Sequence, residues 1–355
     1  MHQPSVVAQA ATRPDSIKVS RNLTPFRPDC RTSRRGAFTA HSDTLTRAFA
    51  LACSAGCCFL EMTICQGEVR ERRHVIGDSF RFVTRATLGY AGAVVVVIAA
   101  ALAFRWPLLR TGFYMDDYIQ LEMLEGRYPL PRQALDLFCW ARGTNENAIL
   151  REAGFLPWWS HPDVKLTMFR PVSSALIWFD HAVFGHNALA YHLHSLAWWV
   201  AFLALFSVIL QEVLPRPAAL LALVLVVAHP AHTILLGWLA SRNAVVAATL
   251  VMLGFWAHLH VRKARSSRAR VAARCVAFGS YVTAMFASEY ALALLPYPAV
   301  YSCLQERNDV RRVLRLIASW GVLAISYAAL RAGLGYGASG SGMYLDPIAD
   351  PLAYV

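Results

Sequence analysis

Two adjacent carboxylates, Asp116 and Asp117, lie at the centre of the stretch RTGFYMDDYIQLE, which directly follows a long apolar run. Like charges side by side repel each other, and this repulsion raises the pKa of one carboxyl group toward the range of a general base. The same pair could hold a divalent cation through its oxygens, or could begin a helix whose dipole favours acidic residues. The residues alone leave these three roles open.

Several cations and imidazoles lie at the ends of apolar segments, where an ionisable group is costly unless it faces a polar cavity or a partner. Arg170 and Arg242 could bind a phosphate as fixed cations, or could reach from the apolar region to the membrane surface. His229 and His232 have the spacing of one helix face, yet they could instead hydrogen-bond the backbone at a helix break around Pro230. The candidate substrate-binding residues are His161, Arg170, His192, His229, His232, Arg242 and Glu289.

The composition predicts a polytopic membrane protein. Of the 355 residues, 56% are hydrophobic and 16% are charged, and the mean hydropathy is +0.39. The net charge of +12 is concentrated in short basic blocks between apolar segments, as in cytoplasmic loops beside anionic lipid. No nucleic-acid-binding module accompanies these blocks. We therefore expect a multi-pass protein of the cell membrane, with membrane lipid and not nucleic acid as a partner.

The apolar runs predict an all-α bundle of about seven membrane-spanning helices. The predicted spans are 88–104, 189–210, 218–228 continuing into HPAHT, 244–259, two short spans within 271–304 broken at SEY, and 314–330. Basic residues precede the first span and follow the second, fourth and sixth, which predicts a cytoplasmic N-terminus. The acidic pair, HPAHT and SEY then fall together on the outer face.

Two regions follow from this topology. Residues 1–85 are rich in Arg, Ser and Thr, and we expect a disordered basic cytoplasmic arm or sequence upstream of the true start codon. Residues 86–355 form the predicted transmembrane domain, with a long extracytoplasmic loop at 110–187.

Three segments of this chain resemble motifs of the transmembrane and tetratricopeptide-repeat O-mannosyltransferases. They are SHPDVKLTMFRPVSSALIWFDHAVFGHNALAYHLHSLAWW, VVAHPAHTILLGWLASRNAVVAA and AMFASEYALALLPYPAVY. DDY after the first span is similar to the acidic pair in the first outer loop of the wider GT-C glycosyltransferase superfamily. The resemblance covers about residues 88–355 and lacks the tetratricopeptide repeats.

The resemblance implies a GT-C-like enzyme that passes a sugar from a polyprenyl-phosphate donor to the hydroxyl of an unknown protein or glycan acceptor outside the cytoplasm. Asp116 or Asp117 would then be a general base or metal contact, with Arg170, His229, Arg242 and Glu289 on matching motif positions.

Three positions that are charged in that family are neutral in this chain, namely Ile234, Asn243 and Ser288. The family also continues with further spans, so we expect a C-terminally shortened bundle. These departures keep an alternative open: a non-catalytic or degenerate polytopic protein, or a lipid or solute carrier.

Overall fold

The computed structural model describes residues 89–342, which belong to one compact unit, Ile76–Val355. The predicted basic arm at 1–85 lies outside the described residues, as does the tail from 343. The helices are Gly89–Arg110, which ends in the 3-10 turn η1 (Trp106–Arg110), α3 (Asp116–Leu124), α4 (Thr144–Glu152), α5 (Pro171–Phe184), α6 (Ala188–Val213), α7 (Arg216–Ala228), α8 (Ala231–Gly237), η2 (Leu239–Ser241), α9 (Arg242–Lys263), α10 (Ser267–Ala287), α11 (Tyr290–Leu294), α12 (Pro296–Gln305) and α13 (Val310–Gly333). The strands are β1 (Cys139–Arg142), β2 (Lys165–Thr167) and β3 (Gly337–Ser339).

Four of the described helices are long and apolar enough to cross a membrane, which indicates a membrane protein. They are Gly89–Arg110, Ala188–Val213, Leu239–Lys263 and Val310–Gly333. A fifth span is formed if α7 and α8 count as one helix bent by 56°. The other spans of the predicted seven stay a prediction.

The bend between α7 and α8 has a local cause and a local compensation. Pro230 has no backbone N–H and interrupts the helical hydrogen bonds at this point. The carbonyl of Val227 instead accepts a hydrogen bond of 2.6 Å from Nη2 of the buried Arg105, whose guanidinium lies 4.5 Å from the ring centre of Trp199. Arg105 thus supplies a donor to a free carbonyl at the C-terminal end of α7, where the helix dipole favours a cation.

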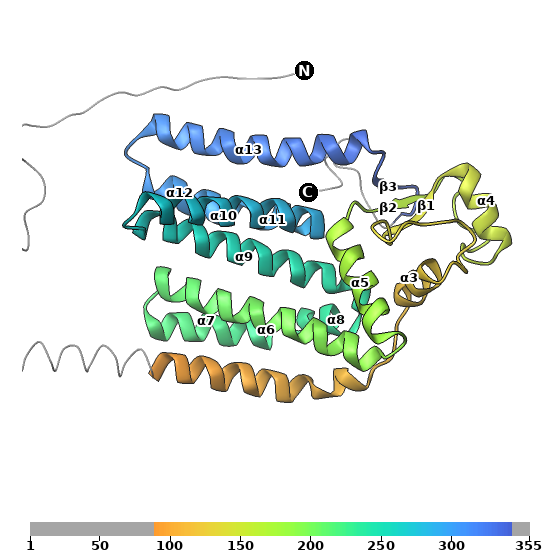
Figure 1. Cartoon of the computed structure of the whole chain (residues 1–355), viewed down its shortest axis with the longest axis horizontal. Coiled ribbons are helices and arrows are strands. Elements are labelled where there is room, and N and C mark those ends of the chain that lie inside the picture. Colours follow the sequence, from red (N-terminus) through yellow and green to blue (C-terminus); the bar gives the residue numbers. More distant parts are fainter. Residues whose placement is uncertain (1–88, 343–355) are drawn as a thin grey trace, which may run out of the picture. The chain divides into compact units, whose positions relative to one another are not determined.

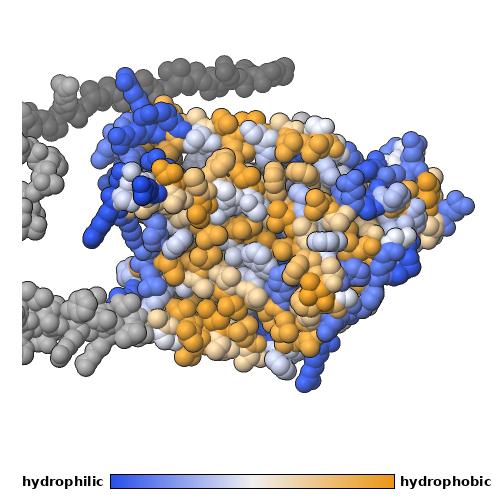
Figure 2. Space-filling model, in the orientation of Figure 1, coloured by the Kyte–Doolittle hydropathy of each residue, from blue (hydrophilic) through white to orange (hydrophobic). Residues whose placement is uncertain are grey.

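The helices lie side by side, and the polar elements gather at one end of this bundle (Figure 1). We call α3, α4, the three strands and their connecting loops the polar cap. The loops α6–α7, α9–α10 and α12–α13 lie at the other end, where Lys263 pairs with Glu212 and Arg262 with Glu306. Hydrophobic residues cover the flank between the two ends (Figure 2), as expected for a surface that faces lipid.

A small antiparallel sheet organises the polar cap, which the all-α prediction did not include. The strand order is β1-β2-β3, so residues that follow α13 close the cap. The register shifts between Cys139 and Ala141, which pair with Thr167 and Leu166, and leaves Trp140 as an extra residue. Such a bulge re-aims neighbouring side chains. Strands of three or four residues give no sustained alternation in a sequence.

The helix α9 packs closely against α10 because Gly254 leaves room for the ring of Tyr281. A Cβ added at Gly254 would lie 2.6 Å from Cε1 of this buried tyrosine.

Replacing Gly254 by Ala should therefore lower the free energy of unfolding by about 1–3 kcal/mol, because the ring has to move within a packed interior. Thermal unfolding in detergent measures the effect. The matched control is Gly279→Ala on α10, where a Cβ meets no atom within 4 Å and should leave stability unchanged or raise it. Equal melting temperatures for the two variants would contradict the proposed close packing.

Candidate functional site

A cavity of about 350 Å³ lies where the polar cap meets the N-terminal end of α9. Its polar and aromatic lining comes from six places in the chain: Asp116 of α3, Phe138 and Trp140 at β1, Arg170 before α5, Trp238 and Ser241 around η2, Asn243 of α9 and Tyr290 of α11. The bulge in β1 accounts for Trp140. Segments far apart in sequence thus build one chamber that contains a carboxyl group, Asp116, and a guanidinium, Arg170.

Asp116 is the acidic group of this cavity. Its side chain is half-buried and has no hydrogen bond or ion pair with another described residue. Burial raises the pKa of this carboxyl group, and the nearby guanidinium of Arg170 opposes that shift. A carboxylate that is partly desolvated and free of partners is available to accept a proton.

Asp117 points elsewhere and holds the local structure together. It is 4% exposed, and its carboxylate accepts hydrogen bonds from the backbone N–H groups of Tyr114 at 2.9 Å, Ala240 at 2.7 Å and Leu239 at 3.4 Å. These bonds join the start of α3 to η2. They also fix the turn at Met115, whose φ of 45° is unusual for a residue with a side chain.

The protonation of Asp117 should make stability depend on pH. Burial, which outweighs the three backbone donors, raises the pKa of its carboxyl group to about 6. Because the folded pKa exceeds the unfolded one, this group stabilises the fold at about pH 4, and the stabilisation is lost as the pH rises through about 6. The melting temperature should fall over that interval. Asp117→Asn, which cannot ionise, should flatten this part of the profile, and an unchanged profile would contradict the shift.

Arg170 supplies the guanidinium that lines the cavity, and Glu289 holds it from outside the lining. Nε and Nη2 of Arg170 donate to the two carboxylate oxygens of Glu289 at 2.9 and 2.5 Å. The guanidinium also lies 5.0 Å from the ring centre of Phe138 and 5.8 Å from that of Tyr290. Two carboxylate bonds and two rings fix its orientation. The structure therefore brings together Asp116, Arg170 and Glu289, three of the residues selected from the sequence.

Arg242 is buried beneath the cavity and does not line it. Its Nη1 lies 2.5 Å from Oδ2 of Asp180, and both side chains are at most 2% exposed. Nδ1 of His194 lies 2.6 Å from the other oxygen of Asp180, while its Nε2 accepts the indole N–H of Trp198 at 3.0 Å. Since indole only donates, the proton lies on Nδ1 and is donated to Asp180. This triad ties α5, α6 and α9 together next to the cavity.

The four histidines selected from the sequence lie away from the cavity. His192 is 1% exposed, with Nε2 3.1 Å from Oγ1 of Thr111 and Nδ1 3.2 Å from the carbonyl of Leu236. Nδ1 of His232 accepts the indole N–H of Trp199 at 3.2 Å. His161 and His229 are exposed. The Nδ1 atom of each accepts a hydrogen bond from the backbone N–H two residues later in the chain. These contacts correspond to imidazoles that satisfy local donors and acceptors.

The aromatic lining and Asn243 were not selected as site residues from the sequence. The only available signal was a concentration of Trp and Tyr near the ends of apolar runs. Among residues 89–342, no group of three or more His, Cys, Asp or Glu side chains could hold a metal ion. A divalent cation at the acidic pair stays a prediction.

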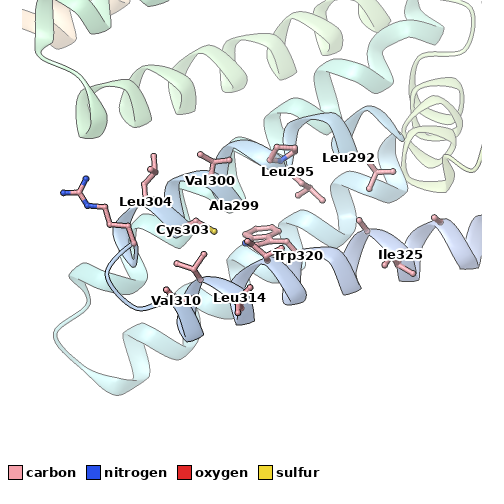
Figure 3. A pocket seen from close by; sticks show the side chains of 16 residues that line it. Leu292, Leu295, Ala299, Val300, Cys303, Leu304, Val310, Leu314, Trp320 and Ile325 are labelled. Carbon is pink, nitrogen blue, oxygen red and sulfur yellow. The ribbon is translucent and has the colours of Figure 1, made fainter. Parts of the chain in front are cut away.

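An apolar groove of about 890 Å³ runs between α12 and α13 (Figure 3). It begins at Leu292, three residues after Glu289, and is lined along its length by residues such as Val300, Leu314 and Trp320. Its other end is at Arg307. The groove can hold a flexible hydrocarbon chain because its walls are almost entirely apolar.

The arrangement offers a proton acceptor, a fixed cation and aromatic walls in one chamber beside a membrane-length bundle. Such a set can remove a proton from a hydroxyl and stabilise an anionic leaving group. Comparison with family models, curated proteins and solved structures finds nothing that matches this chain.

Proposed function

We propose that this protein is a membrane glycosyltransferase, which moves a sugar from a polyprenyl-phosphate donor to an acceptor hydroxyl on the extracytoplasmic face. The observation that carries this proposal is that Asp116 and Arg170 line one cavity at the cap end of the bundle. The motif resemblance described above supplies the class of donor.

In the proposed reaction, the carboxylate of Asp116 takes the proton of the acceptor hydroxyl. The acceptor oxygen forms a bond to the anomeric carbon, and the bond from that carbon to the phosphate oxygen breaks. Polyprenyl phosphate leaves with the electron pair, and the guanidinium of Arg170 stabilises its charge. Glu289 orients this guanidinium through its two hydrogen bonds. The rings of Trp140, Trp238 and Tyr290 provide faces on which a sugar can stack.

The apolar groove supports a lipid-linked donor. It starts close in sequence to Glu289 and extends along the bundle, so an isoprenoid chain could lie in it while the phosphate is near the cap. The basic loops lie at the end of the bundle opposite the polar cap. They support a cytoplasmic location for that end and for the N-terminus, and an extracytoplasmic location for the cap.

The direct test is transfer of a radiolabelled sugar by the purified full-length protein. The assay offers several polyprenyl-phosphate sugars together with peptide and glycan acceptors. We expect label in an acceptor and release of polyprenyl phosphate. A folded protein that transfers label from none of these donors would overturn the proposal.

A carrier is the second candidate, and the break between α7 and α8 favours it. Carriers place discontinuous helices near the substrate, and this break is bent by 56°, with His229 in the break and His232 in the first turn of α8. Exchange of a labelled lipid or solute across a liposome membrane, without formation of a new glycosidic bond, would support this function over transfer.

A further inference from the structure

A second cavity, of about 310 Å³, lies on one face of the small sheet in the polar cap. It is lined by Arg142, Lys165, Thr167 and the segment 334–336 that follows α13. The register explains this lining, because Arg142 and Lys165 are direct partners across the strands and therefore share a face. Thr167, two residues after Lys165, points to the same side.

The two cations are an unfavourable pair for folding. Like charges directly opposite each other destabilise a sheet, and Arg142 and Lys165 are such a pair. The charge of Arg142 is met in part by Asp136, 2.6 Å away, and its Nε donates to Sγ of Cys139 at 3.1 Å. Lys165 has no side-chain hydrogen bond or ion pair with any residue in the described range 89–342. The cavity therefore has an excess positive charge at Lys165.

The other walls of this cavity are held by the fold. The hydroxyl of Thr167 donates to the carbonyl of Gly337 and accepts its N–H, both at 2.9 Å. Tyr336 donates its hydroxyl proton to Asp136 at 3.0 Å. Burial raises the pKa of this phenol to about 12, so it stays a neutral donor at physiological pH. Asp136 is thus occupied by Arg142 and Tyr336, so within residues 89–342 the ammonium of Lys165 has no counter-charge.

We propose that this cavity is an oxyanion-binding site, in which Lys165 and Arg142 together bind a carboxylate or phosphate group. An oxyanion between two cationic partners would convert their repulsion into two charge-assisted contacts. The volume suits a small anion or a charged group on a sugar or peptide. The bulge directs Trp140 to the cavity of Asp116 and Arg142 to this one, so the two sites are distinct. The inference does not rest on sugar transfer.

The test uses the full-length protein in detergent, with inorganic phosphate and acetate as separate probes at constant ionic strength set by sodium chloride. We expect a saturable rise in melting temperature with at least one probe. Lys165→Met should raise the apparent Kd for that probe at least about tenfold, the equivalent of one lost contact to a charged group. Lys165→Arg should retain binding. Saturation by phosphate alone would assign the site to phosphate groups, and saturation by acetate would assign it to carboxylates.

The matched control is Arg151→Gln, which removes a cation of the same polar cap whose Nε donates to the carbonyl of Asn147. This variant should bind the probe within about twofold of the wild type, a difference well below one charge-assisted contact. Without an added anion, Lys165→Met should melt no lower than the wild type, because it removes a like-charge pair. No saturation by either probe, or equal loss in Lys165→Met and Arg151→Gln, would overturn the oxyanion site. Neither result would bear on the role of Asp116.

Discussion

Replacing Asp116 by Asn should reduce sugar transfer by about 10²–10⁴-fold, the range typical for loss of a general base. The amide has nearly the same shape as the carboxylate and cannot accept the proton of the acceptor hydroxyl. The protein should remain folded, because the side chain of Asp116 has no hydrogen bond or ion pair with the described residues. Initial rates of label transfer, at equal amounts of detergent-extracted monodisperse protein, measure the loss.

Two carboxylates on the same helix serve as controls for this variant. Glu122 pairs with Arg127 on the exposed side of α3, so Glu122→Gln should transfer sugar at the wild-type rate. Asp117→Asn changes the adjacent carboxylate, whose oxygens accept backbone N–H groups and do not line the cavity. Because an amide has one acceptor oxygen where the carboxylate has two, this variant should lower stability, and its transfer rate per folded protein should fall far less than that of Asp116→Asn. Full activity in Asp116→Asn, or equal losses in Asp116→Asn and Asp117→Asn, would contradict the assignment of Asp116 as the base.

The pH profile gives a second view of the same group. Because burial raises the pKa of Asp116, the acidic limb of the transfer rate should lie above the usual carboxyl range. Activity should fall as the pH drops through that raised pKa. Arg170 lowers this pKa, so any residual activity of Arg170→Gln should show its acidic limb at a still higher pH.

The sequence analysis grouped Asp116, Arg170 and Glu289 on one side of the predicted bundle, and in the structure Arg170 lines a cavity with Asp116 and pairs with Glu289. Long uncharged runs set the helices, and alternation of the spans with the basic loops brought these three residues to the same side. It could not separate Asp116 from Asp117. Adjacent residues on a helix point about 100° apart, so the one that enters the cavity depends on how α3 docks against η2.

Contacts between distant segments were also beyond the sequence. Asp180 and Arg242 come from α5 and α9, and neither their burial nor their pairing follows from a local pattern. The strand β3 pairs with β2 across 170 residues, with Thr167 bonded to Gly337. Three-residue strands of this kind are formed because their backbone groups find partners in the folded cap, and isolated sequence patterns do not specify those partners.

Breaking the ion pair between Asp180 and Arg242 should have the largest effect on stability. Either Asp180→Leu or Arg242→Met leaves a charge buried without its partner, and each should lower the free energy of unfolding by about 3–5 kcal/mol. Both side chains are at most 2% exposed, so water cannot solvate the remaining charge. Unfolding of the detergent-solubilised protein by heat or denaturant measures both variants.

The double variant separates a structural pair from a phosphate-binding arginine. If the two charges mainly compensate each other, Asp180→Leu combined with Arg242→Met should be more stable than either single variant. His194 would keep its hydrogen bond from Trp198, although its Nδ1 loses Asp180 as an acceptor. Sugar transfer by the double variant should persist, because Arg242 does not line the cavity. A stable Arg242→Met variant that loses donor binding would instead place Arg242 in contact with the phosphate.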